Sequence, residues 1–155
     1  MHWAIAAMIH LVLLASTAEP TKTPEAWDAQ TIVWQKVDSD GTKWAVLEGR
    51  SDVPGEAFTY AAFVPAGYHD FHSHASDARV AVVQGVLKVS FGETVDLEHV
   101  KSYPVGSFLF VPANVKHTMA ADEDTIIIGT AVGPWHTHHP EAQRPAPESK
   151  ARTRR

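Results

Sequence analysis

The sequence contains no cysteine. Disulfide bonds, thiolate metal ligands and cysteine nucleophiles are therefore excluded. Any transition-metal site in this chain must be built from histidine nitrogens and carboxylate oxygens. The absence does not fix the compartment, because a secreted protein can fold without disulfides.

An excess of positive charge is also missing. The chain has 13 Lys and Arg against 18 Asp and Glu, which gives a formal net charge of -5. Nucleic-acid-binding domains usually carry a basic face, and no recognition helix of a helix-turn-helix is indicated here. We therefore expect no nucleic-acid partner.

No apolar run reaches the ~20 residues that a membrane-spanning helix needs. The longest, "WAIAAMIHLVLLA" at 3–15, is followed by small residues at 16–18 and by Glu19-Pro20. This pattern is typical of a signal peptide cleaved after Ala18, although His2 stands where a Lys or Arg is usual. A buried helix is the alternative. We predict a signal peptide over 1–18, a secreted or periplasmic protein, and no stable membrane insertion after cleavage.

Long helical periods are absent from the rest of the chain. Short segments rich in β-branched and aromatic residues recur instead, separated by turn signals such as Asp40-Gly41, Pro54-Gly55 and Gln84-Gly85. The strands expected from them are 31–37, 43–48, 57–64, 79–83, 86–91, 107–111 and 125–132. Many short, evenly spaced strands predict an all-β fold, an antiparallel sandwich or barrel that can close around one small ligand.

The domain organisation follows from the length and from the composition of the two ends. A chain of 155 residues is long enough for one domain with a buried core. We expect a polar linker at 19–28, one domain at 29–139, and a disordered polar tail at 140–155. The tail is rich in proline and charged residues and nearly free of large apolar side chains.

Histidines at a spacing of two suggest a metal site. His72 and His74 share one face of an extended strand, because alternate strand residues point the same way. His117 follows a Pro-Ala-Asn turn later in the chain. Two imidazoles from one strand and a third from another can hold a divalent ion and leave open positions for water or substrate. If the strand register persists, Ala78 lies on the face of the histidines and Arg79 on the opposite face.

These two stretches resemble the paired motifs of the cupin superfamily. The first cupin motif is matched by Gly67, His72, His74 and Gly85, with four residues rather than five after Gly67. The second is matched by Gly106, Pro112 and His117, with Asn114 where glycine is usual. The resemblance extends over residues 30–135 and is closest to small secreted single-domain cupins that end in Gly-Pro-Trp, here 133–135. It implies a single cupin-type β-barrel, the double-stranded β-helix or jelly roll.

The resemblance also implies a ligand set, and this chain departs from it. Cupins usually hold their metal with three histidines and a Glu, but the Glu position here is Ala78 and the Asn position of the second motif is Ala121. Asp77 is a candidate substitute ligand. The expected cofactor is a divalent metal ion (Zn, Fe, Mn or Ni) on His72, His74 and His117.

The sequence leaves three alternative functions open. The first is an exported cupin that acts on a small anionic or carbonyl-bearing organic molecule as a dioxygenase or isomerase. The second is a non-catalytic small-ligand-binding cupin with a degenerate or empty metal site, so that enzyme activity stays open. A third is self-association through edge strands, which would give a homodimer.

The remaining histidines and aromatic residues carry weaker expectations. His69 is expected either at the rim of the site or in contact with the residues that hold the metal, and His99 in solvent. The stretch 136–139 could bind metal, but is expected to be a chain exit with Trp135 packed on the barrel. Aromatic residues inside the strands, Phe108 and Phe110 among them, are expected in the core.

Overall fold

The computed structural model describes residues 23–140, and within them no residue is helical. The strands are β1 (Lys36–Val37), β2 (Lys43–Glu48), β3 (Ala57–Val64), β4 (His69–His74), β5 (Ala78–Gln84), β6 (Val86–Phe91), β7 (Lys101–Pro104), β8 (Phe108–Val111), β9 (His117–Ala121), β10 (Thr125–Val132) and β11 (Thr137–His138). The predicted signal peptide and all of the predicted tail except Pro140 lie outside the described residues. The domain boundaries therefore stay predictions.

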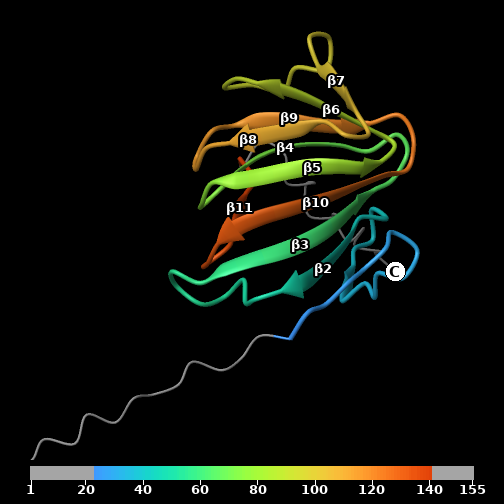
Figure 1. The fold of residues 1–155 in the computed structure, drawn as a ribbon. Helices are drawn as coiled ribbons and strands as arrows, with labels where there is room; N and C mark the ends of the chain where they lie inside the picture. Colours follow the sequence, from blue (N-terminus) through green and yellow to red (C-terminus); the bar gives the residue numbers. More distant parts are fainter. Residues whose placement is uncertain (1–22, 141–155) are drawn as a thin grey trace, which may run out of the picture.

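The strands form two antiparallel sheets. One has six strands in the order β1-β2-β3-β10-β5-β8, and the other has five in the order β11-β4-β9-β6-β7. Figure 1 shows β3, β10 and β5 side by side in one layer. Strands that are distant in the chain become neighbours. β4 pairs with β9, although 42 residues separate the end of β4 at His74 from the start of β9 at His117. The all-β prediction is confirmed.

The core fills the space between the two sheets. Both sheets contribute apolar residues to one cluster: Ala78, Val80, Val82, Leu87, Val89, Leu109, Val111 and Ile127. The predicted parity of β5 is confirmed, because Ala78 is fully buried while Arg79 is exposed. The inner face of β5 is thus hydrocarbon throughout.

The strand prediction for 31–37 is wrong except at its last two residues, which form β1. Two of its apolar residues, Ile32 and Trp34, pack on the outer face of the six-stranded sheet instead, whereas Val33 is exposed. Ile32 is buried against Ala45, Ala61 and Ile126, and Trp34 packs against the same cluster. Ile32 and Trp34 therefore mark a segment that covers the sheet, and only the last two residues of 31–37 pair as a strand.

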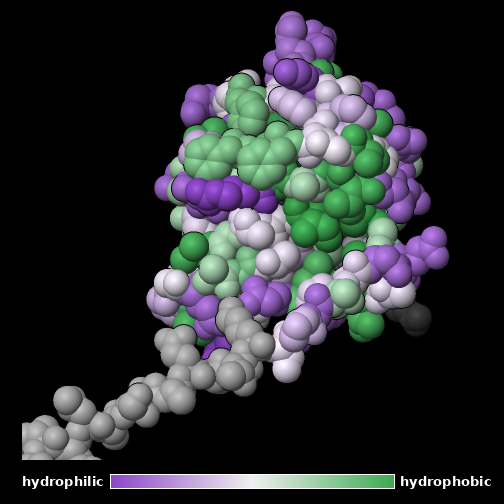
Figure 2. Space-filling view, in the orientation of Figure 1, coloured by the Kyte–Doolittle hydropathy of each residue, from purple (hydrophilic) through white to green (hydrophobic). Residues whose placement is uncertain are grey.

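Phe108 and Phe110 lie on the outer face of β8, contrary to the expectation that they belong to the core. They are 63% and 49% exposed, while Leu109 and Val111 between and beside them are buried. The Arg79 guanidinium lies over the Phe110 ring, 5.1 Å from its centroid. Figure 2 shows hydrophobic side chains gathered over β8 and β5. No helix in the range 23–140 is long and apolar enough to cross a bilayer.

Candidate metal centre

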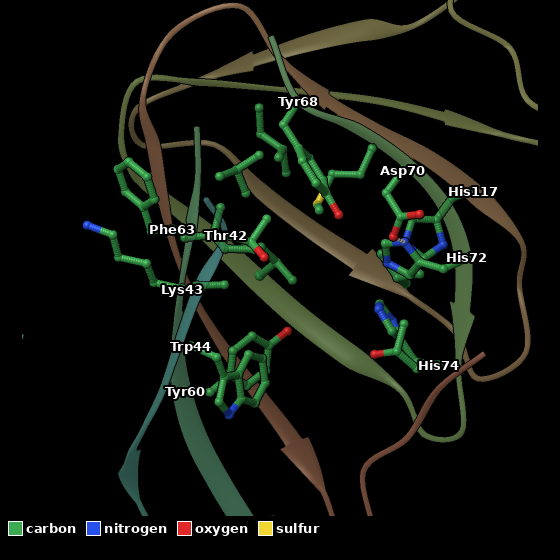
Figure 3. Close-up of a pocket in the computed structure, with 18 of the residues that line it drawn as sticks. Thr42, Lys43, Trp44, Tyr60, Phe63, Tyr68, Asp70, His72, His74 and His117 are labelled. Carbon is green, nitrogen blue, oxygen red and sulfur yellow. Dashed lines mark ion pairs between the residues drawn. The ribbon is translucent and has the colours of Figure 1, made fainter. Parts of the chain in front are cut away.

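The structure brings the three predicted ligands together. His72 and His74 come from β4, His117 begins β9, and the register places His72 directly opposite His117. The ring centroids are 4.3–4.9 Å apart. All three side chains are buried, and each offers a nitrogen within 4.8 Å of the others. Figure 3 shows the three rings on one side of a pocket.

The environments of His74 and His117 favour the neutral form of imidazole that binds a metal ion. Burial lowers the pKa of His74 to about 2 and that of His117 to about 4. The Nδ1 of His117 lies 3.0 Å from the Val115 carbonyl, which can accept its proton and leave Nε2 with a free lone pair. The Nδ1 of His74 is buried without a hydrogen-bond partner. Burying such a polar atom is costly unless an ion or a water binds it, so the donor set fits a divalent metal.

Asp70 is a residue of this site that the sequence interpretation missed. Its Oδ2 lies 2.8 Å from Nδ1 of His72 and 2.9 Å from Nε2 of His139. Burial alone would raise the pKa of Asp70, but these contacts outweigh it and lower that pKa to about 2. An ionised carboxylate at this distance favours a proton on Nδ1 of His72, which would leave Nε2 of His72 free to bind a metal ion. The signal was present, because Asp70, His72 and His74 alternate along one face of β4.

A cavity of about 370 Å³ lies between the sheets beside these residues. The histidines and Asp70 occupy one side, and the other walls are mainly apolar. Trp44 stacks on Tyr60 with centroids 4.2 Å apart and both line the cavity. This volume is at the lower end of the range for small-molecule sites, ~300–1,000 Å³.

A comparison with known protein families identifies the family of this chain. Residues 22–136 match the model described as the ChrR cupin-like domain. The chain belongs to this cupin family. The resemblance inferred from the two histidine motifs is thereby confirmed.

Solved structures show the same fold at low identity. A cupin-like protein of Thermotoga maritima is 19% identical, over 72% of this chain and 90% of that chain, with a TM-score of 0.56. An RmlC-like cupin of Shewanella frigidimarina is 18% identical, over 71% and 91%, with a TM-score of 0.54. A chain in the complex of Rhodobacter sphaeroides SigE with the anti-sigma ChrR is 20% identical, over 67% and 51%, with a TM-score of 0.51. No curated protein matches the chain.

Two positions of this cupin lack the polar groups that the motifs lead one to expect. Ala78 and Ala121 are both buried, at 0% and 1% exposure. Asp77 does not replace the missing Glu, because its Oδ1 accepts a hydrogen bond from the backbone N–H of Ala113 at 2.9 Å. Asp77 also belongs to neither group of residues in the described range that could hold an ion. The carboxylate nearest to the histidines is that of Asp70.

The C-terminal strand of this cupin closes the site. β11 pairs with β4, with Thr137 opposite His74. The Trp135 ring lies 4.4 Å from the His74 ring and packs against Phe58 and Tyr60, as the sequence predicted for this residue. His139 contacts Asp70, and with Asp70 and His72 it forms a second group that could hold an ion, in line with the weaker of the two expectations for 136–139.

The other histidines lie outside the group of three. His99 contacts Asp96 on an exposed loop, with 80% of its side chain accessible. His69 is exposed at the start of β4, as expected for a rim position. Neither belongs to a group in the described residues that could hold a metal ion.

Proposed function

We propose that this cupin binds one divalent metal ion with His72, His74 and His117 and acts on a small anionic or carbonyl-bearing organic molecule. The observation that carries the proposal is the convergence of three buried imidazoles, two of which, His72 and His74, have a buried Nδ1 without a hydrogen-bond partner, although that of His72 lies beside the Asp70 carboxylate. An ion held by three neutral ligands keeps its full charge and supplies a Lewis acid for anionic or carbonyl oxygens.

The protein's own groups prepare the site for such a molecule. Asp70 and the Val115 carbonyl fix ring protons of His72 and His117 on their outer nitrogens. The apolar walls of the cavity exclude water, which strengthens electrostatic interactions inside it. Burial and the nearby Asp70 carboxylate raise the pKa of Tyr68, so its phenol stays protonated and can donate to a bound oxygen.

A second candidate function is binding of a small ligand without turnover. The observation that favours it is the pair of buried alanines, Ala78 and Ala121, in place of the polar groups of the motifs. Asp70 is engaged by two histidines, so no described carboxylate faces the histidine group as a free base. Under this proposal the same ion and cavity serve to retain a ligand, and a substrate screen would show no product.

Location and assembly belong to the same proposal. The apolar segment 3–15 and the small residues before Glu19 support export to the periplasm or the exterior. The homodimer also stays a prediction. It is supported by β8, which lies at one edge of the six-stranded sheet and presents two exposed phenylalanines.

Metal analysis of untagged protein tests the proposed site. We expect about one divalent ion per chain in the wild type, and loss of it in His72→Ala and in His117→Ala. His99→Ala is the matched control, because it removes an imidazole from an exposed loop and should leave the metal content unchanged. Retention of the ion in both site variants, or its loss in His99→Ala, would overturn the assignment.

A further inference from the structure

The walls of the cavity differ sharply in polarity. The polar side is formed by β4 and β9, which carry the three histidines and Asp70. The remaining walls include Val80, Leu109, Val111 and Ile127 from the six-stranded sheet, and Val89 and Met119 from the other. A ligand that fills this space meets mainly hydrocarbon, apart from the histidines and Asp70 at one end, the phenol groups of Tyr60 and Tyr68, and polar side chains near the rim.

Polar side chains near the rim are already engaged with other groups. The Lys36 ammonium pairs with Asp38 at 2.8 Å, and the Thr42 hydroxyl donates to Asp40 at 2.7 Å. The Lys43 ammonium lies over the Phe63 ring, 4.5 Å from its centroid, and Figure 3 shows it extending away from the histidines. Hydroxyl groups along the body of a ligand would therefore compete with existing partners.

We infer that the cavity takes a small monocarboxylate with an apolar body, such as an aryl- or branched-alkyl-substituted acid, in preference to a polyhydroxylated acid. This inference rests on the proposed function, because the ion on the histidines receives the carboxylate. Histidine binds a metal ion as a neutral imidazole and brings no negative charge, so an anionic end is favoured at a centre made of His72, His74 and His117. A sugar acid would bury several hydroxyls against hydrocarbon without partners, whereas an apolar body gains from the same burial.

Three probes of similar size separate the contributions of charge and polarity. Zinc-loaded protein is titrated calorimetrically with 3-phenylpropionate, with the uncharged 3-phenylpropanol, and with the polyhydroxylated glucuronate. We expect 3-phenylpropionate to bind tighter than either of the others by about tenfold or more. Glucuronate binding as tightly as 3-phenylpropionate, or 3-phenylpropanol binding equally well, would overturn the inference.

A change of cavity volume tests whether this cavity is the binding place. Ala62 lines the cavity and packs against the core between the sheets, so Ala62→Leu fills space without adding polarity. Its affinity for 3-phenylpropionate should fall by about tenfold or more, with zinc content retained. Ala66→Leu is the matched control, since Ala66 lies in the exposed turn before β4 and does not line the cavity.

The outcomes separate this inference from the proposed function. If zinc does not bind, or binds independently of His72 and His117, the proposed function fails and the ligand preference fails with it. If zinc binds at the histidines and 3-phenylpropionate has no advantage, only the ligand preference is wrong. If Ala62→Leu retains zinc and the full affinity for 3-phenylpropionate, the molecule binds elsewhere and the inference is overturned.

Discussion

Asp70 shows how one side chain can direct a site without being one of the three converging ligands. It precedes His72 by two residues on β4, so it shares the inward face, and its carboxylate lies between the rings of His72 and His139. The position that would ordinarily supply a Glu is a buried methyl group, Ala78. Negative charge is thus kept near the centre by Asp70, which contacts His72 and is not one of the three residues that would hold the ion.

Removal of Asp70 should weaken metal binding without abolishing it. We expect Asp70→Ala to lower zinc affinity by about 10- to 100-fold, because the proton and the orientation of the His72 ring are no longer fixed. Asp70→Asn keeps an acceptor but no charge and should lie between the two. The measurement is competition with a chelator of known affinity.

Weaker zinc binding by Asp70→Ala could come from damage to the fold or from loss of the orientation of the His72 ring, and the two causes must be distinguished. Asp122→Ala is the matched control, since Asp122 is an exposed carboxylate paired with Lys88 away from the histidines. Thermal unfolding of the metal-free variants should show whether Asp70→Ala has damaged the fold. Equal zinc affinity in Asp70→Ala and in the wild type would contradict the positioning role.

At the level of elements, the pairing of β3 with β10 depends on a close approach between two strands. Gly129 of β10 lies opposite Tyr60 of β3 in the register. A Cβ at position 129 would overlap the Tyr60 ring, and that ring is held on its other side by the stacked Trp44. Because Gly129 has no Cβ, there is space for the Tyr60 ring, which together with Trp44 forms the aromatic wall of the cavity.

Gly129→Ala should therefore destabilise the protein. We expect the free energy of unfolding to fall by about 1–3 kcal/mol, because the Tyr60 ring must move out of a packed cluster. Urea denaturation followed by circular dichroism measures the change. Gly92→Ala is the control, since a Cβ there meets nothing within 4 Å, and its effect should stay within about 0.5 kcal/mol. Equal denaturation midpoints for the two variants would show that Tyr60 is free to move.

At the level of the whole molecule, folding collects three imidazoles from two strands into an apolar interior, and burial favours the neutral form of two of them, His74 and His117. Burial lowers the pKa of His74 to about 2 and that of His117 to about 4, from the ordinary histidine pKa of 6.5. In the unfolded chain both residues titrate near 6.5. Below that pH the unfolded state binds protons that the folded state does not accept, so acid favours unfolding.

The metal-free protein should thus lose stability as the pH falls from about 6.5 to 4. Each of the two histidines contributes a slope of up to about 1.4 kcal/mol per pH unit, and below about pH 4 the contribution of His117 ends. Protonation of Asp70 adds to the loss only between pH 3.8, the ordinary pKa of an Asp side chain, and about pH 2, its pKa in the folded protein. Urea denaturation at a series of pH values measures the slope.

The variant His117→Gln gives the comparison for this slope. It should show a shallower dependence on pH, because one depressed imidazole is gone, whereas His99→Ala should keep the wild-type dependence. A stability that does not change between pH 6.5 and 4 would mean that the buried rings accept protons in the folded state.

Local patterns in the sequence determined the fold class, the family resemblance, the three histidines and the inward face of β5. Alternation along a strand and the spacing of turn residues are properties of neighbouring residues, so they are readable without coordinates. The stretch "SFLFV" has no polar residue to mark its outer face after Ser107, and the orientation of Phe108 and Phe110 was therefore assigned wrongly from it. Only the tertiary structure decided that Asp70 contacts the centre while Asp77 holds a backbone N–H, and that β11 brings Trp135 and His139 to it. These contacts depend on which distant strands become neighbours, and strand pairing across the chain leaves no local signal in the sequence.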